Sequence, residues 1–246
     1  MLKLFQFWTR RQDMTQDAAV RHLVEVHAPR IGDIAAESIE RYASNVALAC
    51  NYSGWIADEA PAYDGVGEFW FSGDDVGELK GALLGRAAVR GPGERDFIGT
   101  AQLMVAEQTV QLDRGRRHAG VKTMFLLTRR PEMTRDEAIA YWHDRHAPLV
   151  RDTLGDALVR YATNVGVAAD LSGWPDEASP YDGVAELWLD LSMDEMLSTV
   201  AKAASVLLPD ERAFLGTYRW LVVDEVVHRG GEQAPLPATP DADTGR

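Results

Sequence analysis

The sequence is poor in cysteine, in basic residues and in long apolar runs. Its single cysteine, Cys50, excludes an internal disulfide framework and a four-cysteine zinc site, and fits a reducing compartment. Asp and Glu outnumber Lys and Arg by 38 to 25, so a phosphate backbone would be repelled and nucleic acid is not an expected partner. The first residues are too charged for a signal peptide, and no apolar run could span a membrane. We therefore expect a soluble, cytoplasmic protein with no membrane partner.

Motifs for nucleotide cofactors and serine hydrolysis are also missing. There is no Gly-x-Gly-x-x-Gly, no phosphate loop and no Gly-x-Ser-x-Gly. His143 and His146 are three residues apart and could share a metal, but no third ligand is evident. We expect no metal and no cofactor. At 246 residues and 46% hydrophobic content, the chain can bury a full core without them.

What the sequence does contain is an internal repeat. Shifted by 119 positions, residues 3–11 (KLFQFWTRR) overlie residues 122–130 (KTMFLLTRR). Further along, after one deletion, YDGVGEFWF at 63–71 meets YDGVAELWL at 181–189. Such self-similarity indicates duplicated structural units. We predict homologous units at 1–111 and 121–228, a linker at 112–120 and a disordered tail at 229–246.

Each unit predicts the order β-α-β-β-α-β, which is a ferredoxin-like unit. In the second unit Thr134 and Glu137 form a capping box at the start of the first helix, and Pro148 should end or kink that helix. One unit alone leaves an apolar sheet face bare, and the duplicated partner can cover it. We therefore predict an α+β fold in which two ferredoxin-like βαββαβ repeats pack sheet to sheet as an intrachain dimeric α/β barrel. This pseudo-dimer would be monomeric, and whether it forms a further homodimer is left open.

Three motifs in this order resemble the EthD domain family of dimeric α/β-barrel proteins. They are YWHDRHAP (141–148), RYATN (160–164) and YDGVAELW (181–188). The first unit keeps His-Ala-Pro at 27–29, Arg-Tyr-Ala-Ser-Asn at 41–45 and Tyr-Asp-Gly at 63–65, but has His22-Leu23 in place of the Tyr-Trp pair. The resemblance covers both units. It implies cofactor-free chemistry on aromatic or polyketide-like molecules, such as dehydration or cyclisation, and the family also includes proteins of unclear role in degradation pathways.

Two pairs of residues are candidates for proton transfer. His27 and His146 each lie on an apolar helical stripe just before a proline, where a histidine can shuttle a proton or can be satisfied within the core. Glu68 and Glu186 stand between large apolar neighbours on a strand. If buried, these carboxyl groups would have raised pKa values and could act as general acid or base. The alternative is an ion pair with an arginine of the neighbouring strand.

The amides of Asn45 and Asn164 are candidates for holding an enolate or carbonyl oxygen, or for satisfying a strand corner. Strand alternation places them on one face and Tyr42 and Tyr161 on the other. An aromatic pocket could be lined by five tryptophans, each of which could equally be a core or plug residue: Trp55, Trp70, Trp142, Trp174 and Trp188.

These residues lead to three hypotheses of function. The first is a cofactor-independent lyase of the cyclase or dehydratase type, acting on a hydrophobic, carbonyl-bearing small molecule between sheet and helix. His146, Glu186 or both would move the proton, and Asn164 or Tyr161 would steady the oxyanion, with His27 and Glu68 as the first-unit equivalents. The second is a non-catalytic small-ligand-binding protein of a degradation pathway. The third is an α/β-barrel oxygenase, with or without haem.

Overall fold

The computed structural model describes residues 2–34, 39–48, 62–71, 73, 75–77, 93–115, 120–169 and 177–230. In the first half the elements are β1 (Leu2–Arg10), α1 (Gln16–His22), the π-helical turn η1 (Leu23–His27), α2 (Ala28–Ile34), β2 (Ile39–Ala47), β3 (Gly65–Phe71) and β4 (Ile98–Asp113). In the second half they are β5 (Val121–Arg129), α5 (Arg135–Tyr141), the π-helical turn η2 (Trp142–His146), α6 (Ala147–Leu154), the 3-10 turn η3 (Gly155–Ala157), β6 (Leu158–Gly166), β7 (Glu177–Ala178), β8 (Gly183–Leu189), α7 (Met193–Phe214) and β9 (Leu215–Arg229).

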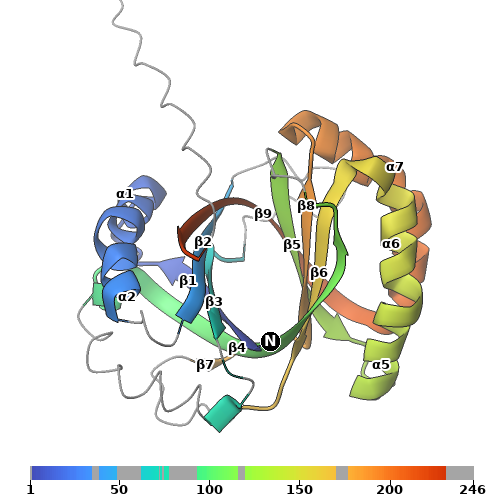
Figure 1. The fold of residues 1–246 in the computed structure, drawn as a ribbon, viewed down its shortest axis with the longest axis horizontal. Helices are drawn as coiled ribbons and strands as arrows, with labels where there is room; N and C mark the ends of the chain where they lie inside the picture. Colours follow the sequence, from blue (N-terminus) through green and yellow to red (C-terminus); the bar gives the residue numbers. More distant parts are fainter. Residues whose placement is uncertain are drawn as a thin grey trace, which may run out of the picture.

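Eight antiparallel strands close into a barrel (Figure 1). Their order is β1-β3-β2-β9-β5-β8-β6-β4, and β4 pairs back onto β1. The two halves are joined by strand pairs at both edges, β2 with β9 and β4 with β6. The predicted intrachain barrel is confirmed, but the halves close edge to edge through backbone hydrogen bonds rather than only by facing side chains. The short strand β7 adds to β4 in parallel.

The helices lie outside the barrel, with α1 and α2 on one side and α5, α6 and α7 on the other (Figure 1). Successive strand side chains point alternately into the barrel and toward the helices, and both sets are buried. The apolar side chains of the barrel interior are Phe5, Phe7, Val66, Met104, Ala106, Met124, Leu126, Val184, Leu221 and Val223. This double burial explains why β3 and β8 carry apolar residues on both faces.

A π-helical turn carries the helix past its proline in each half. In the second half the N–H of Ala147 donates to the carbonyl of Trp142, five residues back, and Pro148 then falls in the first turn of α6. A proline is tolerated there because the first turn of a helix needs no N–H donor. The helix therefore does not end at Pro148, which was one of the two predicted outcomes, but continues to Leu154. The predicted capping box of Thr134 and Glu137 is confirmed.

An indole occupies the same place between helix and sheet in both halves, although it comes from different elements. In the first half Trp8 of β1 lies against Gly65, where a Cβ would come within 2.5 Å of its ring. In the second half Trp142 of η2 lies against Gly183, where a Cβ would come within 2.7 Å of its ring. The repeat aligns Trp8 with a leucine on β5, and Trp142 with Leu23. The first unit has Leu23 in place of the tryptophan on the helix, and Trp8 of β1 supplies the indole there instead.

One predicted boundary shifts slightly. Strand β4 includes Leu112 and Asp113, which the sequence analysis assigned to the linker. Most of the segment between β3 and β4, where the predicted order places the second helix of the first unit, lies outside the described residues, as do Cys50 and nearly all of the predicted tail. Among the helices in the described ranges, none is long and apolar enough to cross a membrane.

Candidate functional site

The sheet separates the residues that the sequence analysis expected to act together. Glu186 points into the barrel, where it pairs with Lys3 and Lys122. His146 packs on the outer side of the sheet, with its ring 5.1 Å from that of Phe214. A joint role of His146 and Glu186 on one substrate is therefore wrong. Alternation along a strand assigns residues to two faces, but here both faces are buried and the pattern does not say which one meets the helices.

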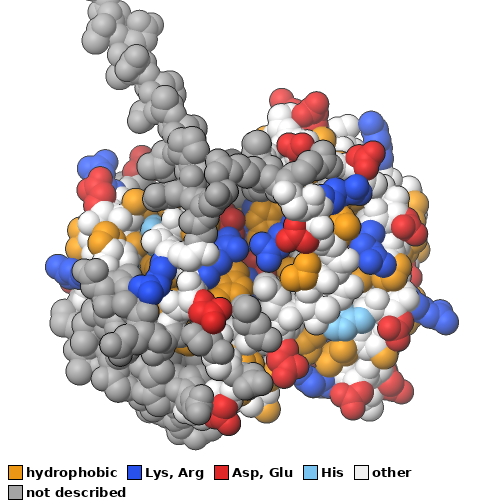
Figure 2. All heavy atoms as spheres, viewed as in Figure 1, with side chains coloured by type: hydrophobic (Ala, Val, Ile, Leu, Met, Phe, Trp, Pro, Cys, Tyr) orange, Lys and Arg blue, Asp and Glu red, His pale blue; other side chains and the backbone are white. Residues whose placement is uncertain are grey.

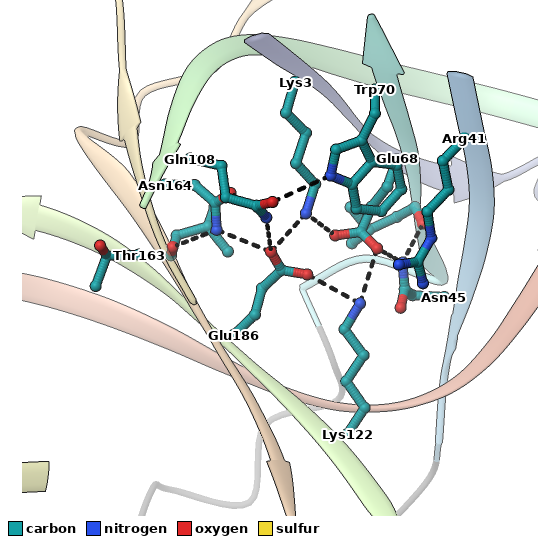
Figure 3. Close-up of polar contacts among 12 residues, drawn as sticks. Lys3, Arg41, Asn45, Glu68, Trp70, Gln108, Lys122, Thr163, Asn164 and Glu186 are labelled. Atoms are coloured by element: carbon teal, nitrogen blue, oxygen red, sulfur yellow. Dashed lines mark hydrogen bonds and ion pairs between the residues drawn. The ribbon is translucent and has the colours of Figure 1, made fainter. Parts of the chain in front are cut away.

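Inside the barrel, two lysines and two glutamates form a buried charge network (Figure 3). Lys3 Nζ lies 2.6 Å from Glu68 Oε1 and 2.5 Å from Glu186 Oε2. Lys122 Nζ lies 2.7 Å from Glu68 Oε2 and 2.9 Å from Glu186 Oε1. All four side chains are at most 1% exposed. The ion-pair alternative for the glutamates is supported, with lysines as partners in place of the expected arginines.

Amides and indoles surround this network. Asn45 Nδ2 donates to Glu68 Oε2 at 2.9 Å, and Asn164 Nδ2 donates to Glu186 Oε2 at 2.8 Å. Trp70 and Trp188 lie under the ammonium groups, with Lys3 Nζ 4.2 Å from the first ring centre and Lys122 Nζ 4.6 Å from the second. Six predicted residues therefore meet in the barrel: Asn45, Glu68, Trp70, Asn164, Glu186 and Trp188.

Sequence reasoning missed four members of the network, which are Lys3, Gln108, Lys122 and Glu225. Lys3 and Lys122 occupy equivalent positions of the repeat, each among the apolar residues that make up most of its strand. A lysine kept at both positions of an apolar strand could have indicated a buried partner, because an unpaired buried charge is very costly.

The lysines and the carboxylates shift one another's pKa values. Burial raises the pKa of Glu68, and the negative charge of Glu186 raises it further, against the opposing effect of Lys122 and Lys3. Burial alone would also raise the pKa of Glu186, but Lys122 and Lys3 outweigh it and hold that pKa well below its usual range. Burial lowers the pKa of Lys3 even though both glutamates oppose it. Glu68 is therefore the carboxyl group of this pair that takes up a proton most readily.

One substitution breaks the symmetry of the network. Gln108 and Glu225 are equivalent in the repeat. Gln108 Nε2 donates to Asn164 Oδ1 at 3.1 Å. The Glu225 carboxylate has no N–H to donate to Asn45, the counterpart of Asn164. Asn45 Oδ1 has no hydrogen-bond partner among the described residues. Glu225 Oε1 instead accepts from Lys122 Nζ at 2.7 Å. The second half thus contributes a third carboxylate to the barrel.

On the outer face of the second half, a histidine–aspartate pair lies between helix and sheet. His146 Nδ1 lies 2.7 Å from Asp210 Oδ2, and Tyr141 donates to the other carboxylate oxygen at 2.9 Å. Because a carboxylate only accepts, this contact makes Nδ1 the protonated nitrogen and leaves a lone pair on Nε2. Trp142 Nε1 donates to the Tyr161 hydroxyl at 3.1 Å in the same layer.

Burial adjusts the proton affinities beside this pair. It lowers the pKa of His146, although Asp210 opposes the effect, so the imidazole is neutral near pH 7. Burial, assisted by the charge of Asp210, raises the pKa of Glu211 to about 7. A neutral base and a carboxyl group that is partly protonated near pH 7 are thus placed on adjoining elements.

A small apolar hollow lies in the same layer and shares Phe214 with the surroundings of His146, although neither His146 nor Asp210 lines it. Its walls include Trp142, Phe214, Ile139 and Gly183, and charged side chains such as Arg135 stand at its edge. The space inside it for the centres of water-sized molecules is about 20 Å³, which corresponds to one or two waters. A larger ligand therefore needs side chains of α5 to move outward.

In the first half, Glu94 is an acidic neighbour of His27 among the described residues. His27 Nε2 lies 3.8 Å from Glu94 Oε1, which is beyond hydrogen-bond distance. Tyr42 lies in this helix-facing layer, with its ring stacked on Phe69. Trp55 and Trp174 lie outside the described residues. His143 Nε2 contacts Thr163 Oγ1 at 3.0 Å, and in the described ranges no three His, Cys, Asp or Glu side chains are arranged to hold a metal.

Comparisons with known proteins agree with this architecture. Over 97% of this chain and 96% of the other, the structure resembles an anthrone oxidase-like protein, with a TM-score of 0.56 and 14% identity. A protein from Lactobacillus acidophilus with a provisional monooxygenase assignment matches over 94% and 96% of the chains, with a TM-score of 0.52 and 7% identity. A mutant chlorite dismutase from Candidatus Nitrospira defluvii matches over 91% of each chain, with a TM-score of 0.50 and 9% identity. At these identities the likeness shows the fold alone.

A search among curated proteins finds no match. The EthD domain family, in contrast, matches twice, once in each half. The matched residues are 11–101 and 130–217, so the chain belongs to the EthD domain family and carries two copies of its domain.

Proposed function

We propose that this protein is a cofactor-independent lyase of the dehydratase or cyclase type, which acts on a small, apolar, carbonyl-bearing molecule at the outer face of its second half. The observation that carries the proposal is the contact of 2.7 Å between His146 Nδ1 and Asp210 Oδ2, with the His146 ring 5.1 Å from that of Phe214, which is also a wall of the apolar hollow. An oriented, neutral imidazole next to an apolar wall is suited to remove a proton from a carbon acid.

The reaction can be followed through His146 alone. Nε2 removes a proton from the carbon next to the substrate carbonyl, which leaves an enolate and an imidazolium that Asp210 stabilises. The enolate re-forms the carbonyl and expels the β-hydroxyl group, which takes the proton from Nε2 and departs as water. Positioned acid–base help of this kind supplies roughly 10²–10⁴-fold. Orientation in the apolar hollow must supply the remainder.

Tyr161 replaces Asn164 as the oxyanion partner in this proposal. Asn164 is bound to Glu186 inside the barrel, on the far side of the sheet. The Tyr161 hydroxyl accepts from Trp142 and keeps its own proton, because burial raises its pKa. It is therefore a neutral donor in the layer that contains His146.

The test uses 4-hydroxy-4-phenylbutan-2-one, whose dehydration product absorbs in the near ultraviolet. We expect turnover by the full chain, a loss of about 10²–10⁴-fold in His146→Ala, and no loss in the matched control His27→Ala. Equal loss in both variants would contradict a role for the second half alone. Binding of the compound without turnover would favour the ligand-binding alternative.

A second candidate reaction starts from the same proton abstraction. The likeness to an anthrone oxidase-like protein suggests anthrone as a probe. Its deprotonated form could react with dioxygen, and anthrone plus O₂ would give anthraquinone plus water. Oxygen uptake with anthrone that depends on His146, without dehydration of the hydroxyketone, would make oxidation the function.

We also propose that each half is a ferredoxin-like unit, as its sequence suggested. In both halves the strands lie in the spatial order last, first, third, second, which is the order of a ferredoxin-like sheet and supports this proposal.

A further inference from the structure

In the barrel interior, an amine of the first half and an amide of the second half lie against the same carboxylate oxygen (Figure 3). Lys3 Nζ is 2.5 Å from Glu186 Oε2, and Asn164 Nδ2 is 2.8 Å from that oxygen. All three side chains are fully buried. Lys3 belongs to β1 and Asn164 to β6, so the contact brings a nucleophile and an electrophile from the two halves together.

The surroundings of this trio favour attack of the amine on the amide. Burial lowers the pKa of Lys3, although Glu186 and Glu68 oppose it, which favours the neutral amine that acts as a nucleophile. Lys122 and Lys3 outweigh burial and hold the pKa of Glu186 well below its usual range, so its carboxylate is free to accept a proton. Gln108 Nε2 donates to Asn164 Oδ1 at 3.1 Å, where negative charge would develop during the attack.

The equivalent trio of the repeat lacks two of these features. Lys122 Nζ and Asn45 Nδ2 lie 2.7 and 2.9 Å from Glu68 Oε2. Burial alone would lower the pKa of Lys122, but the surrounding carboxylates outweigh it and raise that pKa, so the ammonium group stays protonated. Glu225 stands where the other trio has Gln108, and Asn45 Oδ1 has no hydrogen-bond partner in the described part of the chain. The barrel therefore contains the same trio with and without a free amine and a carbonyl donor.

We propose that Lys3 and Asn164 react to form an isopeptide bond that joins the two halves, whereas Lys122 and Asn45 do not. The ion pairs of Lys3 belong to the chain before this reaction. Afterwards Lys122 is the close ammonium group of Glu68 and Glu186 among the described residues. The bond forms on the inner side of the sheet, so it does not depend on the reaction proposed for the outer face.

Protons and bonds balance within the trio. Lys3 Nζ gives one proton to Glu186 Oε2, and the free amine attacks Asn164 Cγ. As the new C–N bond forms, the bond between Cγ and Nδ2 breaks, while Glu186 gives its proton to Nδ2 and takes up a second proton from Nζ. The products are a secondary amide and ammonia, which takes the proton from Glu186 and leaves as ammonium. One oxygen serves both transfers because the two nitrogens are held against it.

Ammonia has a short way out of the barrel. Lys3 Nζ lies 4.2 Å from the centre of the Trp70 ring, and the guanidinium carbon of Arg41 lies 4.6 Å from the same point. The Arg41 side chain is 22% exposed. Figure 2 shows Lys or Arg surface beside apolar surface at the centre of the ring of strands that Figure 1 draws from the same viewpoint. Loss of ammonia to solvent at this end makes the reaction irreversible.

The test is the intact mass of the purified full chain under denaturing conditions. We expect a mass lower than that of the sequence by one ammonia, and trypsin should release a branched peptide in which residue 3 is joined to residue 164. Lys3→Arg keeps the positive charge but has no amine to form the bond, so its mass should equal that of its sequence. The matched control Lys202→Arg changes an exposed lysine of α7 and should still lose one ammonia.

Gln108→Glu guards against loss of folding, because it copies the trio that the barrel already contains at Lys122. We expect the linked fraction to fall at least tenfold, with an unchanged circular dichroism spectrum. An unmodified chain with its full sequence mass would overturn the proposal. So would an ammonia loss that maps to residues other than 3 and 164, or a linked fraction that is the same in Gln108→Glu.

Discussion

Removal of Lys122 should show how far the barrel depends on its buried charges. Its ammonium group lies within 3 Å of three carboxylates, those of Glu68, Glu186 and Glu225. Lys122→Met preserves most of the side-chain volume. Among the described residues it leaves Lys3 as the close ammonium group of Glu68 and Glu186, and leaves Glu225 with Arg41 at 3.6 Å. Breaking a buried ion pair from one side costs about 3–5 kcal/mol. For a chain of this size, that corresponds to a fall in Tm of roughly 6–20 °C.

The loss should depend on pH, and its sign follows from the carboxylates. Without Lys122, burial and mutual repulsion raise the pKa of Glu186 and Glu225 in the folded state above the value of the unfolded chain. A group whose folded pKa is raised contributes stability at low pH and loses it as pH rises through that pKa. The difference between Lys122→Met and the unmodified chain should therefore be larger at pH 8 than at pH 5.

Urea unfolding followed by circular dichroism at pH 5 and pH 8 measures both effects. Lys202→Met is the matched control, because Lys202 is exposed on α7, and it should change the free energy of unfolding by less than about 0.5 kcal/mol. A loss below 1 kcal/mol in Lys122→Met, or one that is equal at both pH values, would refute the reasoning.

Three further predictions concern packing, symmetry and titration. Trp142→Leu should lower the free energy of unfolding by about 3 kcal/mol. Adding Leu127→Trp copies the Trp8 and Leu23 arrangement of the first half and should recover most of that loss in a double-mutant cycle of thermal unfolding. No recovery would show that the two indole positions are not interchangeable. Glu225→Gln can give Asn45 Oδ1 the donor that it lacks and should change the free energy of urea unfolding by less than about 1 kcal/mol, a much smaller effect than that of Lys122→Met. Burial raises the folded-state pKa of Glu211 to about 7, so its contribution to the free energy of unfolding is complete below pH 4.5 and fades as pH rises through 7. Glu211→Gln should therefore flatten the dependence of stability on pH between pH 5 and 8 by up to roughly 3 kcal/mol. An unchanged pH dependence would argue against a buried Glu211.

The repeat accounts for how much of the fold could be predicted. Aligned copies gave the intrachain barrel, and the Thr134 capping box gave the start of α5. The continuation of the helix through Pro148 was missed, because a π-helical turn upstream moves the proline into a first turn where its missing N–H is not needed. A proline pattern alone does not distinguish a helix end from such a turn.

The candidate site was predicted in parts that turned out to belong to two places. The strand pattern placed Glu186 correctly between apolar neighbours, and the helical stripe placed His146 correctly in a buried layer. Which face of β8 meets the helices could not be read from the pattern, because both faces are apolar. Asp210 was also out of reach: it is 64 residues from His146, and its counterpart in the repeat is a glycine, so only the fold brings the two together.

The pH dependence of kcat/KM for dehydration of 4-hydroxy-4-phenylbutan-2-one tests the central claim most directly. If the neutral imidazole of His146 is the base, kcat/KM should rise with pH and level off with a pKa below the ordinary 6.5, because burial lowers that of His146. His146→Ala should abolish this rise. A rate that falls between pH 5 and 7, or a profile that is unchanged in His146→Ala, would contradict the account.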